Sequence, residues 1–298
     1  MRSSLPAAIL TLAVCQLFAS TLDAQASPPP GRAQPSPRRP ALQRAGGIQG
    51  SEFVIVAHDK GFDAPSQVDA GLVNVRLFNR STATQHFAIL KVDRLDRVAS
   101  IVEYLRAGDW NVPWISRMGG PESSAPGGVS SVSMMLDAGR YVVAQLPVAP
   151  TRGGPLVLTE VQELAVIRRA DGAGAAALPA TEVTLRMNEW GFTLEGPLVA
   201  GRRTLRVENA GQFEHHVSIV RFLPGRTFDQ VVRWAEHPTG PSPYEAVGGT
   251  TNVERGRAVN VTVDLMPGDY ALLCTTWNPL SKQLHSQHGM VKQLRVIS

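Results

Sequence analysis

The sequence predicts an all-β chain built from two β-sandwich domains in tandem, each with one short helix. The first observation is compositional: only 6% of the 298 residues are aromatic, whereas 27 are glycine and 22 are proline, and valine and threonine recur in short runs. This composition favours many short strands joined by turns. The second is that the length favours about two domains, for which a hydrophobic content of 43% supplies two separate cores. The third is an internal repeat.

The first 26 residues are expected to be a signal peptide. Arg2 precedes an apolar stretch from Leu5 to Phe18, and the run Ala24-Gln25-Ala26 has the small-x-small pattern of a cleavage site. The apolar stretch is shorter than the roughly 20 residues that a membrane span requires. We therefore expect cleavage after Ala26, no membrane span in the mature chain, and a periplasmic or secreted location.

Residues 27–50 are expected to form an extended linker. They contain six prolines and four arginines but no acidic residue, a composition that disfavours a packed core. The four arginines also account for the formal net charge of +4. Because the rest of the chain is formally neutral, the sequence predicts no nucleic-acid partner.

Residues 51–165 and 181–298 are predicted to be two copies of one unit, joined by a linker at 166–180. Residues 119–141 run without a gap against residues 248–270. Earlier in the copies, Gly61-Phe62 aligns with Gly191-Phe192, and further framework residues correspond: Val75, Asn79 and Ile89 with Val207, Asn209 and Ile219.

Each copy is expected to consist of short alternating strands and one helix at the same place. One strand face is outlined by alternating apolar residues, namely Val259, Val261, Val263 and Leu265. In the first copy, apolar residues between 95 and 105 have helical spacing and Gly108 ends the helix. In the second, Thr227 and Gln230 predict a capping box, and Pro238 ends the helix.

The second copy contains residues typical of a metal site. A predicted strand ends at Cys274, and His285 and Met290 follow; upstream, His215 and His216 begin another strand. One thiolate, imidazoles and a thioether suit a soft or borderline metal, and Cys, two His and a weak axial Met make a trigonal copper site. Each residue taken alone also has a plain structural interpretation, as a buried Cys, a polar strand start or a core Met.

The first copy lacks this set. Gln85 stands at the position of His215 and Gln145 at that of Cys274, and no His or Met follows before the copy ends. If these residues were generic packing in this fold, some would persist in both copies. The sequence therefore predicts that the first copy binds no metal and serves as a scaffold, a spacer or a partner surface.

These motifs resemble those of the cupredoxin, or blue-copper, family. The resemblance rests on His215-x-Val217, on Gly268-x-Tyr270-x-x-x-Cys274 and on His285-x-x-x-Gly289-Met290. It implies Greek-key β-sandwiches and one type 1 copper ion held by His215, Cys274, His285 and Met290. His216 is the alternative ligand, or a residue that ties loops together around the site. Zinc is the competing metal, but Met is a poor zinc ligand.

The expected function is one-electron transfer between periplasmic or extracellular redox proteins that dock transiently. His285 is expected at an exposed loop edge, with Trp277 nearby. A catalytic multicopper site requires His-x-His pairs, and the sequence has none; the chain is therefore expected not to be an enzyme. Copper storage or delivery, and a metal-free exported interaction module, are the alternatives.

Overall fold

The computed structural model describes residues 50–94, 100–101, 103, 112–122, 124–146, 160–168, 177–278 and 280–298. The predicted signal peptide, the linker up to residue 49 and most of the linker at 166–180 lie outside the described residues. The predicted first helix also lies largely outside them, although Ser100, Ile101 and Glu103 are helical.

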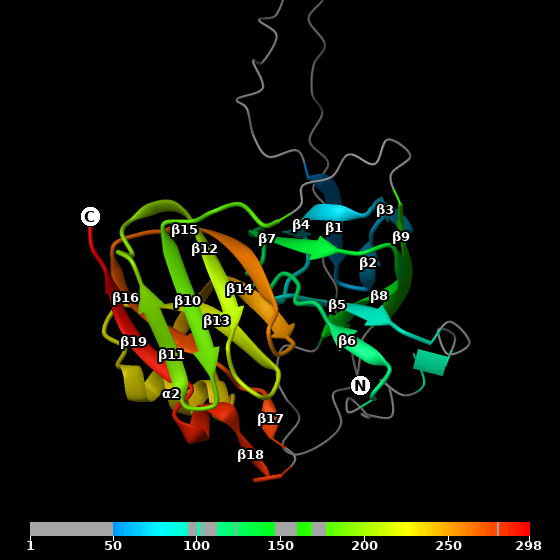
Figure 1. Cartoon of the computed structure of the whole chain (residues 1–298). Coiled ribbons are helices and arrows are strands. Elements are labelled where there is room, and N and C mark those ends of the chain that lie inside the picture. The colour runs from blue at the N-terminus through cyan, green and yellow to red at the C-terminus, as the bar shows by residue number, and fades with distance from the viewer. Residues whose placement is uncertain are drawn as a thin grey trace, which may run out of the picture. The chain divides into compact units, whose positions relative to one another are not determined.

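The described part of the chain is mostly β-strand (Figure 1). The N-terminal half contains β1 (Ser51–His58), β2 (Gly61–Asp63), β3 (Gln67–Asp69), β4 (Gly71–Asn79), β5 (His86–Val92), β6 (Ile115–Arg117), β7 (Val129–Leu136), β8 (Gly139–Leu146) and β9 (Glu160–Ile167). The C-terminal half contains β10 (Val183–Asn188), β11 (Gly191–Glu195), β12 (Gly201–Asn209), β13 (His215–Phe222), α2 (Phe228–Glu236), β14 (Tyr244–Val253), β15 (Ala258–Leu265), β16 (Gly268–Leu273), β17 (Trp277–Asn278), β18 (Gln283–Leu284), the 3-10 helix η2 (His285–His288) and β19 (Val291–Val296).

Each half is a β-sandwich, as the sequence predicts. The N-terminal half packs strands of a long sheet against a five-stranded sheet of order β3-β9-β8-β5-β6. The C-terminal half packs its part of the long sheet against a four-stranded sheet of order β14-β13-β16-β19. Alternating side chains of each strand face the core between the two sheets. In β15 the predicted apolar residues are all buried, namely Val259, Val261, Val263 and Leu265.

The helix α2 forms where the sequence predicts it. The side chain of Thr227 accepts a hydrogen bond from the backbone N–H of Gln230, whose side chain accepts one from the backbone N–H of Thr227, so the capping box is present. The helix ends at Glu236, two residues before Pro238. Its buried residues Val231 and Ala235 pack against the sheet that carries β13 and β16.

The same local contacts recur in the two halves. The hydroxyl of Tyr141 donates to the carbonyl oxygen of Asp137 at 2.9 Å, and that of Tyr270 donates to the carbonyl oxygen of Met266 at 2.8 Å. Burial, the larger influence, raises the pKa of Tyr141 to about 12 and also raises that of Tyr270. Both hydroxyls therefore remain protonated donors over the physiological range.

The two halves share one core rather than having two separate ones. The long sheet has the order β11-β10-β12-β15-β7-β4-β1-β2, and its halves join where β15 pairs with β7, for example at Val261 and Val132. The buried apolar residues on both sides of this junction belong to one continuous cluster. The expectation of two separate cores is therefore wrong. Because β15 and β7 pair edge to edge within one sheet, the buried face of one half continues directly into that of the other.

A second connection joins the other layer. Residues 117–121, which also bond to β5, pair with residues 250–254 at the end of β14. Gly120 accepts from the N–H of Thr251, and Arg117 accepts from the N–H of Glu254, both at 3.0 Å. Because β14 pairs in turn with β13, the N-terminal half is hydrogen-bonded to the strand arrangement that carries the candidate site.

Gly249 is required for this arrangement. Its φ is +140°, and a Cβ atom there would lie 1.9 Å from the carbonyl oxygen of Val217 on β13. Gly120, at the corresponding place in the N-terminal half, would place a Cβ 2.1 Å from the carbonyl oxygen of Phe87. Both glycines let neighbouring backbones approach closely.

We predict that Gly249→Ala lowers the free energy of unfolding by about 3 kcal/mol, because a strained backbone and a backbone clash must both be relieved. Chemical denaturation measures it. The control is Gly256→Ala, whose φ is +73° but whose Cβ would have nothing within 4 Å; it should cost only about 1 kcal/mol. Equal losses in the two variants would contradict the role of the close approach.

Candidate metal centre

Three buried side chains from distant parts of the chain converge in the C-terminal half. His215 begins β13, Cys274 directly follows β16, and His285 begins η2. Their ligand atoms all lie within 4.8 Å of one another. The Nδ1 atoms of His215 and His285 are 3.0 Å apart, and the sulfur of Cys274 is 3.6 Å from Nδ1 of His285.

Backbone hydrogen bonds fold the loop that brings these residues together. The N–H of His285 donates to the carbonyl of Thr276 at 2.9 Å, and β17 pairs with β18 within the loop. The N–H of Cys274 donates to the carbonyl of Met290 at 3.0 Å, and that of Met290 donates to the carbonyl of His285 at 3.1 Å. The paired strands β17 and β18 thus form a hairpin between Cys274 and His285, and Met290 is fully buried beside the site.

The donor set, its burial and its spacing fit a type 1 copper site. Separations of 3.0 and 3.6 Å are close to those of donor atoms that share one ion at about 2.0 to 2.3 Å. Two imidazole nitrogens and one thiolate are also the trigonal set that copper takes in electron-transfer sites. The structure brings together the predicted His215, Cys274 and His285, and it places Met290 next to them through its backbone; their role as ligands stays a prediction.

The surroundings favour the thiolate form of Cys274, which is completely buried. Burial alone raises the pKa of the thiol, but the neighbouring imidazoles of His216, His215 and His285 bring that pKa well below its usual range. The thiolate is the form that binds a metal.

His216 lies outside the cluster of three and holds the chain around it. Its Nε2 accepts from the backbone N–H of Thr275 at 3.1 Å, and its Nδ1 lies 3.0 Å from the hydroxyl of Thr276. That hydroxyl donates to the side-chain oxygen of Asn252 at 3.1 Å and lies 3.5 Å from the sulfur of Cys274. Both ring nitrogens of His216 are therefore engaged by the residues that follow Cys274.

The sequence analysis missed Glu189, which faces the far side of the His215 ring. Its Oε1 lies 3.6 Å from Nε2 of His215 and accepts the backbone N–H groups of Gln212 and Phe213. At this distance the carboxylate acts on the His215 ring through its charge and packing and not through a hydrogen bond. Comparison of the two copies could have predicted a carboxylate here, because Asp59 stands at the matching place before Gly61-Phe62. Asp59 accepts hydrogen bonds from the N–H and the hydroxyl of Thr82.

We predict that Gly211→Ala weakens metal binding about tenfold, because its Cβ would lie 2.6 Å from Oε1 of Glu189 and 2.7 Å from Nε2 of His215, displacing the ring. Competition titration with a Cu(I) chelator measures the loss. Gly139→Ala is the control, since a Cβ there meets nothing closer than 3.7 Å. Unchanged affinity in Gly211→Ala would show that the ring does not depend on this packing.

The corresponding place in the N-terminal half is filled by a hydrogen-bonded glutamine pair. Nε2 of Gln145 donates to Oε1 of Gln85 at 2.7 Å, and Nε2 of Gln85 donates to the hydroxyl of Ser81 at 2.8 Å. Both glutamines are buried. Neutral amides thus bond to one another at the positions that hold an imidazole and a thiolate in the C-terminal half.

The structure corrects the expected exposure of His285, which is only 4% accessible. The ring is covered because η2 and the backbone bond to Met290 turn it inward. Trp277 is exposed, as expected of a neighbouring contact residue. His288 remains outside the cluster and pairs with the hydroxyl of Ser281 at 2.7 Å.

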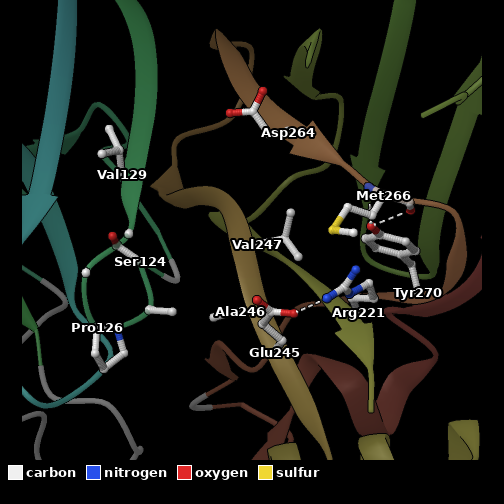
Figure 2. A pocket seen from close by; sticks show the side chains of 13 residues that line it. Ser124, Pro126, Val129, Arg221, Glu245, Ala246, Val247, Asp264, Met266 and Tyr270 are labelled. Carbon is white, nitrogen blue, oxygen red and sulfur yellow. Dashed lines mark hydrogen bonds and ion pairs between the residues drawn. The ribbon is translucent and has the colours of Figure 1, made fainter. Parts of the chain in front are cut away.

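A separate pocket of about 300 Å³ lies away from this centre (Figure 2). It is bordered by residues 124–129 of the N-terminal half and by Arg221, Glu245 and Tyr270 of the C-terminal half. Tyr270 precedes Cys274 by four residues on an extended strand, a separation of about 13 Å along the chain. Arg221 and Glu245 form an ion pair with each other across its lining, so the pocket presents no unpaired charge from that pair.

Across the part of the chain that the structure describes, no helix has the length and apolar character needed to cross a membrane.

Solved structures with a similar arrangement are copper proteins. Dithionite-reduced auracyanin from Roseiflexus castenholzii matches at 18% identity with a TM-score of 0.28, over 40% of this chain and 98% of its own. A copper-containing nitrite reductase from Thermus scotoductus SA-01 matches at 14% identity and a TM-score of 0.24, over 82% of this chain and 61% of its own. A multi-copper oxidase from Pseudomonas thermotolerans matches at 14% identity and a TM-score of 0.25, over 85% of this chain and 69% of its own.

All of these TM-scores lie below 0.5, so the likenesses assign neither a family nor an activity to this chain. No protein-family model matches the sequence, and no curated protein matches it. The expectation that the chain is not an enzyme is wrong as a conclusion from its architecture, because copper nitrite reductases and multicopper oxidases are among the matched structures. The same sandwich framework can carry an electron-transfer site or a catalytic site. The missing His-x-His pairs do not by themselves exclude catalysis.

Proposed function

We propose that this chain is an exported type 1 copper protein that transfers single electrons between redox partners. The observation that carries the proposal is the buried convergence of His215, Cys274 and His285, with donor atoms within 4.8 Å of one another. A single centre with a soft sulfur ligand suits electron exchange.

The three side chains would hold copper through two Nδ1 atoms and one sulfur, with Met290 as a weak fourth donor. Bound copper supplies a one-electron couple between Cu(II) and Cu(I). One electron enters from a reduced partner and one leaves to an oxidised partner, and no proton or chemical group is transferred. The protein contributes a fixed donor geometry, because His216 and Thr276 hold the chain at Cys274 and Glu189 lies behind His215.

Exposed apolar side chains on the loops around the site favour transient docking of a redox protein. Trp190 is 77% exposed and Leu280 80%, and Phe213 and Trp277 are also exposed. Trp190 lies against Gly289, whose Cβ would be 3.2 Å from the carbonyl oxygen of Trp190. A partner on these loops would approach closest to His285 and Met290, which flank Gly289 in the sequence.

Export and domain organisation belong to the same proposal. The charged start, apolar stretch and Ala24-Gln25-Ala26 pattern support removal of a signal peptide and a periplasmic or secreted location. The boundaries 51–165 and 181–298 are supported by matching contacts: Nδ2 of Asn79 donates to the carbonyl of Ala83 at 2.8 Å, and Nδ2 of Asn209 donates to that of Phe213 at 2.7 Å.

We predict that the purified chain binds one Cu(II) ion and develops an intense thiolate-to-copper charge-transfer band in visible absorption. Cys274→Ser should abolish the band and weaken binding at least about 100-fold, since it removes the thiolate. His215→Gln should also abolish the band. A wild-type protein that stays colourless through the Cu(II) titration would contradict the proposed function.

His216→Gln is the matched control for His215→Gln, since both replace adjacent buried imidazoles by the same amide. We expect His216→Gln to keep the band and to weaken copper binding by about tenfold, because it loosens the residues after Cys274 without removing a donor. The reverse pattern would identify His216 as the ligand.

We predict that replacing both Trp190 and Trp277 by Ser slows electron transfer to cytochrome c about tenfold while the reduction potential stays unchanged, because docking and not the centre is altered. Stopped-flow absorbance measures the second-order rate. Ile297→Ser removes an exposed apolar side chain elsewhere and should leave the rate unchanged. Equal rates in all three proteins would exclude these loops as the docking surface for that probe.

A further inference from the structure

A buried carboxylate of the N-terminal half, Glu122, contacts the strand that carries His215. The residue is 6% exposed. Its Oε1 accepts from the hydroxyl of Ser218 on β13 and pairs with Nδ1 of His86 on β5, both at 2.9 Å. The copper-site interpretation assigns no role to this carboxylate.

Glu122 lies on the same side of β13 as His216. Successive side chains of a strand point to opposite faces. Val217 and Ile219 belong to the core of the sandwich, so His216 and Ser218 point away from that core, toward the segment that contains Glu122. Burial alone raises the pKa of Glu122, but His86, His216 and the hydroxyl of Ser218 together bring it below its usual value. The ionised form of the carboxylate is therefore favoured, on the side of β13 that carries His216.

The segment before Glu122 is fixed to the same region by further bonds. Arg117 forms an ion pair with Glu214, the neighbour of His215, and accepts the N–H of Glu254 at 3.0 Å. Gly120 accepts the N–H of Thr251 at 3.0 Å. Residues 117–122 thus contact the first part of β13 at two points: Arg117 binds Glu214 just before the strand, and Glu122 binds Ser218 within it.

We propose that Glu122 is a positioning residue for the copper centre, acting across the junction between the halves on His216. It fixes Ser218 and faces His216, whose ring holds the N–H of Thr275 and the hydroxyl of Thr276 directly after Cys274. Its negative charge also stabilises the more highly charged copper state, Cu(II). The half without metal ligands is then part of the centre. This inference rests on the proposed copper function.

The test uses the full chain with Glu122→Gln, which keeps the size of the side chain and one oxygen acceptor but removes the charge. We expect normal copper stoichiometry and an approximately tenfold rise in the affinity for Cu(I) relative to Cu(II). For a one-electron couple this corresponds to a reduction potential about 59 mV higher. Glu163→Gln is the control, since Glu163 lies in the same half and pairs on the surface with Arg140; its potential should equal that of the wild type.

A second readout needs no copper. In the metal-free protein, Glu122→Ala should exchange the Thr275 amide hydrogen at least tenfold faster than wild type, because the His216 ring that accepts it is no longer held. If Glu122→Ala does not fold, the same exchange measured in Glu122→Gln decides, with at least a threefold acceleration expected.

The outcomes separate the two proposals. If wild-type protein binds copper but the Glu122 variants match Glu163→Gln in potential and in Thr275 exchange, the positioning role is overturned and the copper function stands. If wild-type protein binds no copper, the copper function falls, and with it the inference that rests on it, whatever the exchange of Thr275.

Discussion

The C-terminal half surrounds the fully buried sulfur of Cys274, whose thiolate form is favoured by its neighbours. Such a charge is stable in a protein interior only where hydrogen bonds and neighbouring positive or polar groups replace its hydration. Around Cys274 these are the imidazoles of His215, His216 and His285 and the hydroxyl of Thr276. The strands, the hairpin after Cys274 and η2 each place one of these groups, so together they supply the polar surroundings of this one sulfur atom.

The connection between the halves gives that environment its rigidity. The long sheet continues through β15 and β7, and the second layer continues through residues 117–121 and 250–254. The contacts are reciprocal: Glu122 reaches Ser218 of the other half, and the hydroxyl of Thr251 donates to the carbonyl of Phe87 at 3.1 Å. The described residues accordingly form one compact unit.

Local patterns were predictable from the sequence, and long-range contacts were not. The capping box at Thr227, the alternation in β15 and the grouping of Cys274 with His285 depend on residues near one another in the chain. The choice of His215 over its neighbour His216 came from a family resemblance. The joined core, the contact of Glu122 with β13 and the burial of His285 depend instead on which strand edges pair and how a loop folds back. Periodicity does not encode strand partners, and Glu189 could have been found only by comparing the two copies.

The complete burial of Cys274 also determines the chemical durability of the protein. A thiol with a lowered pKa is the form that peroxides attack most readily, giving sulfenic and then irreversible sulfinic acids. Here the sulfur has no accessible surface, so a dissolved oxidant reaches it only when the chain around it opens locally. Burial therefore protects a thiol whose lowered pKa would otherwise make it an easy target for oxidation.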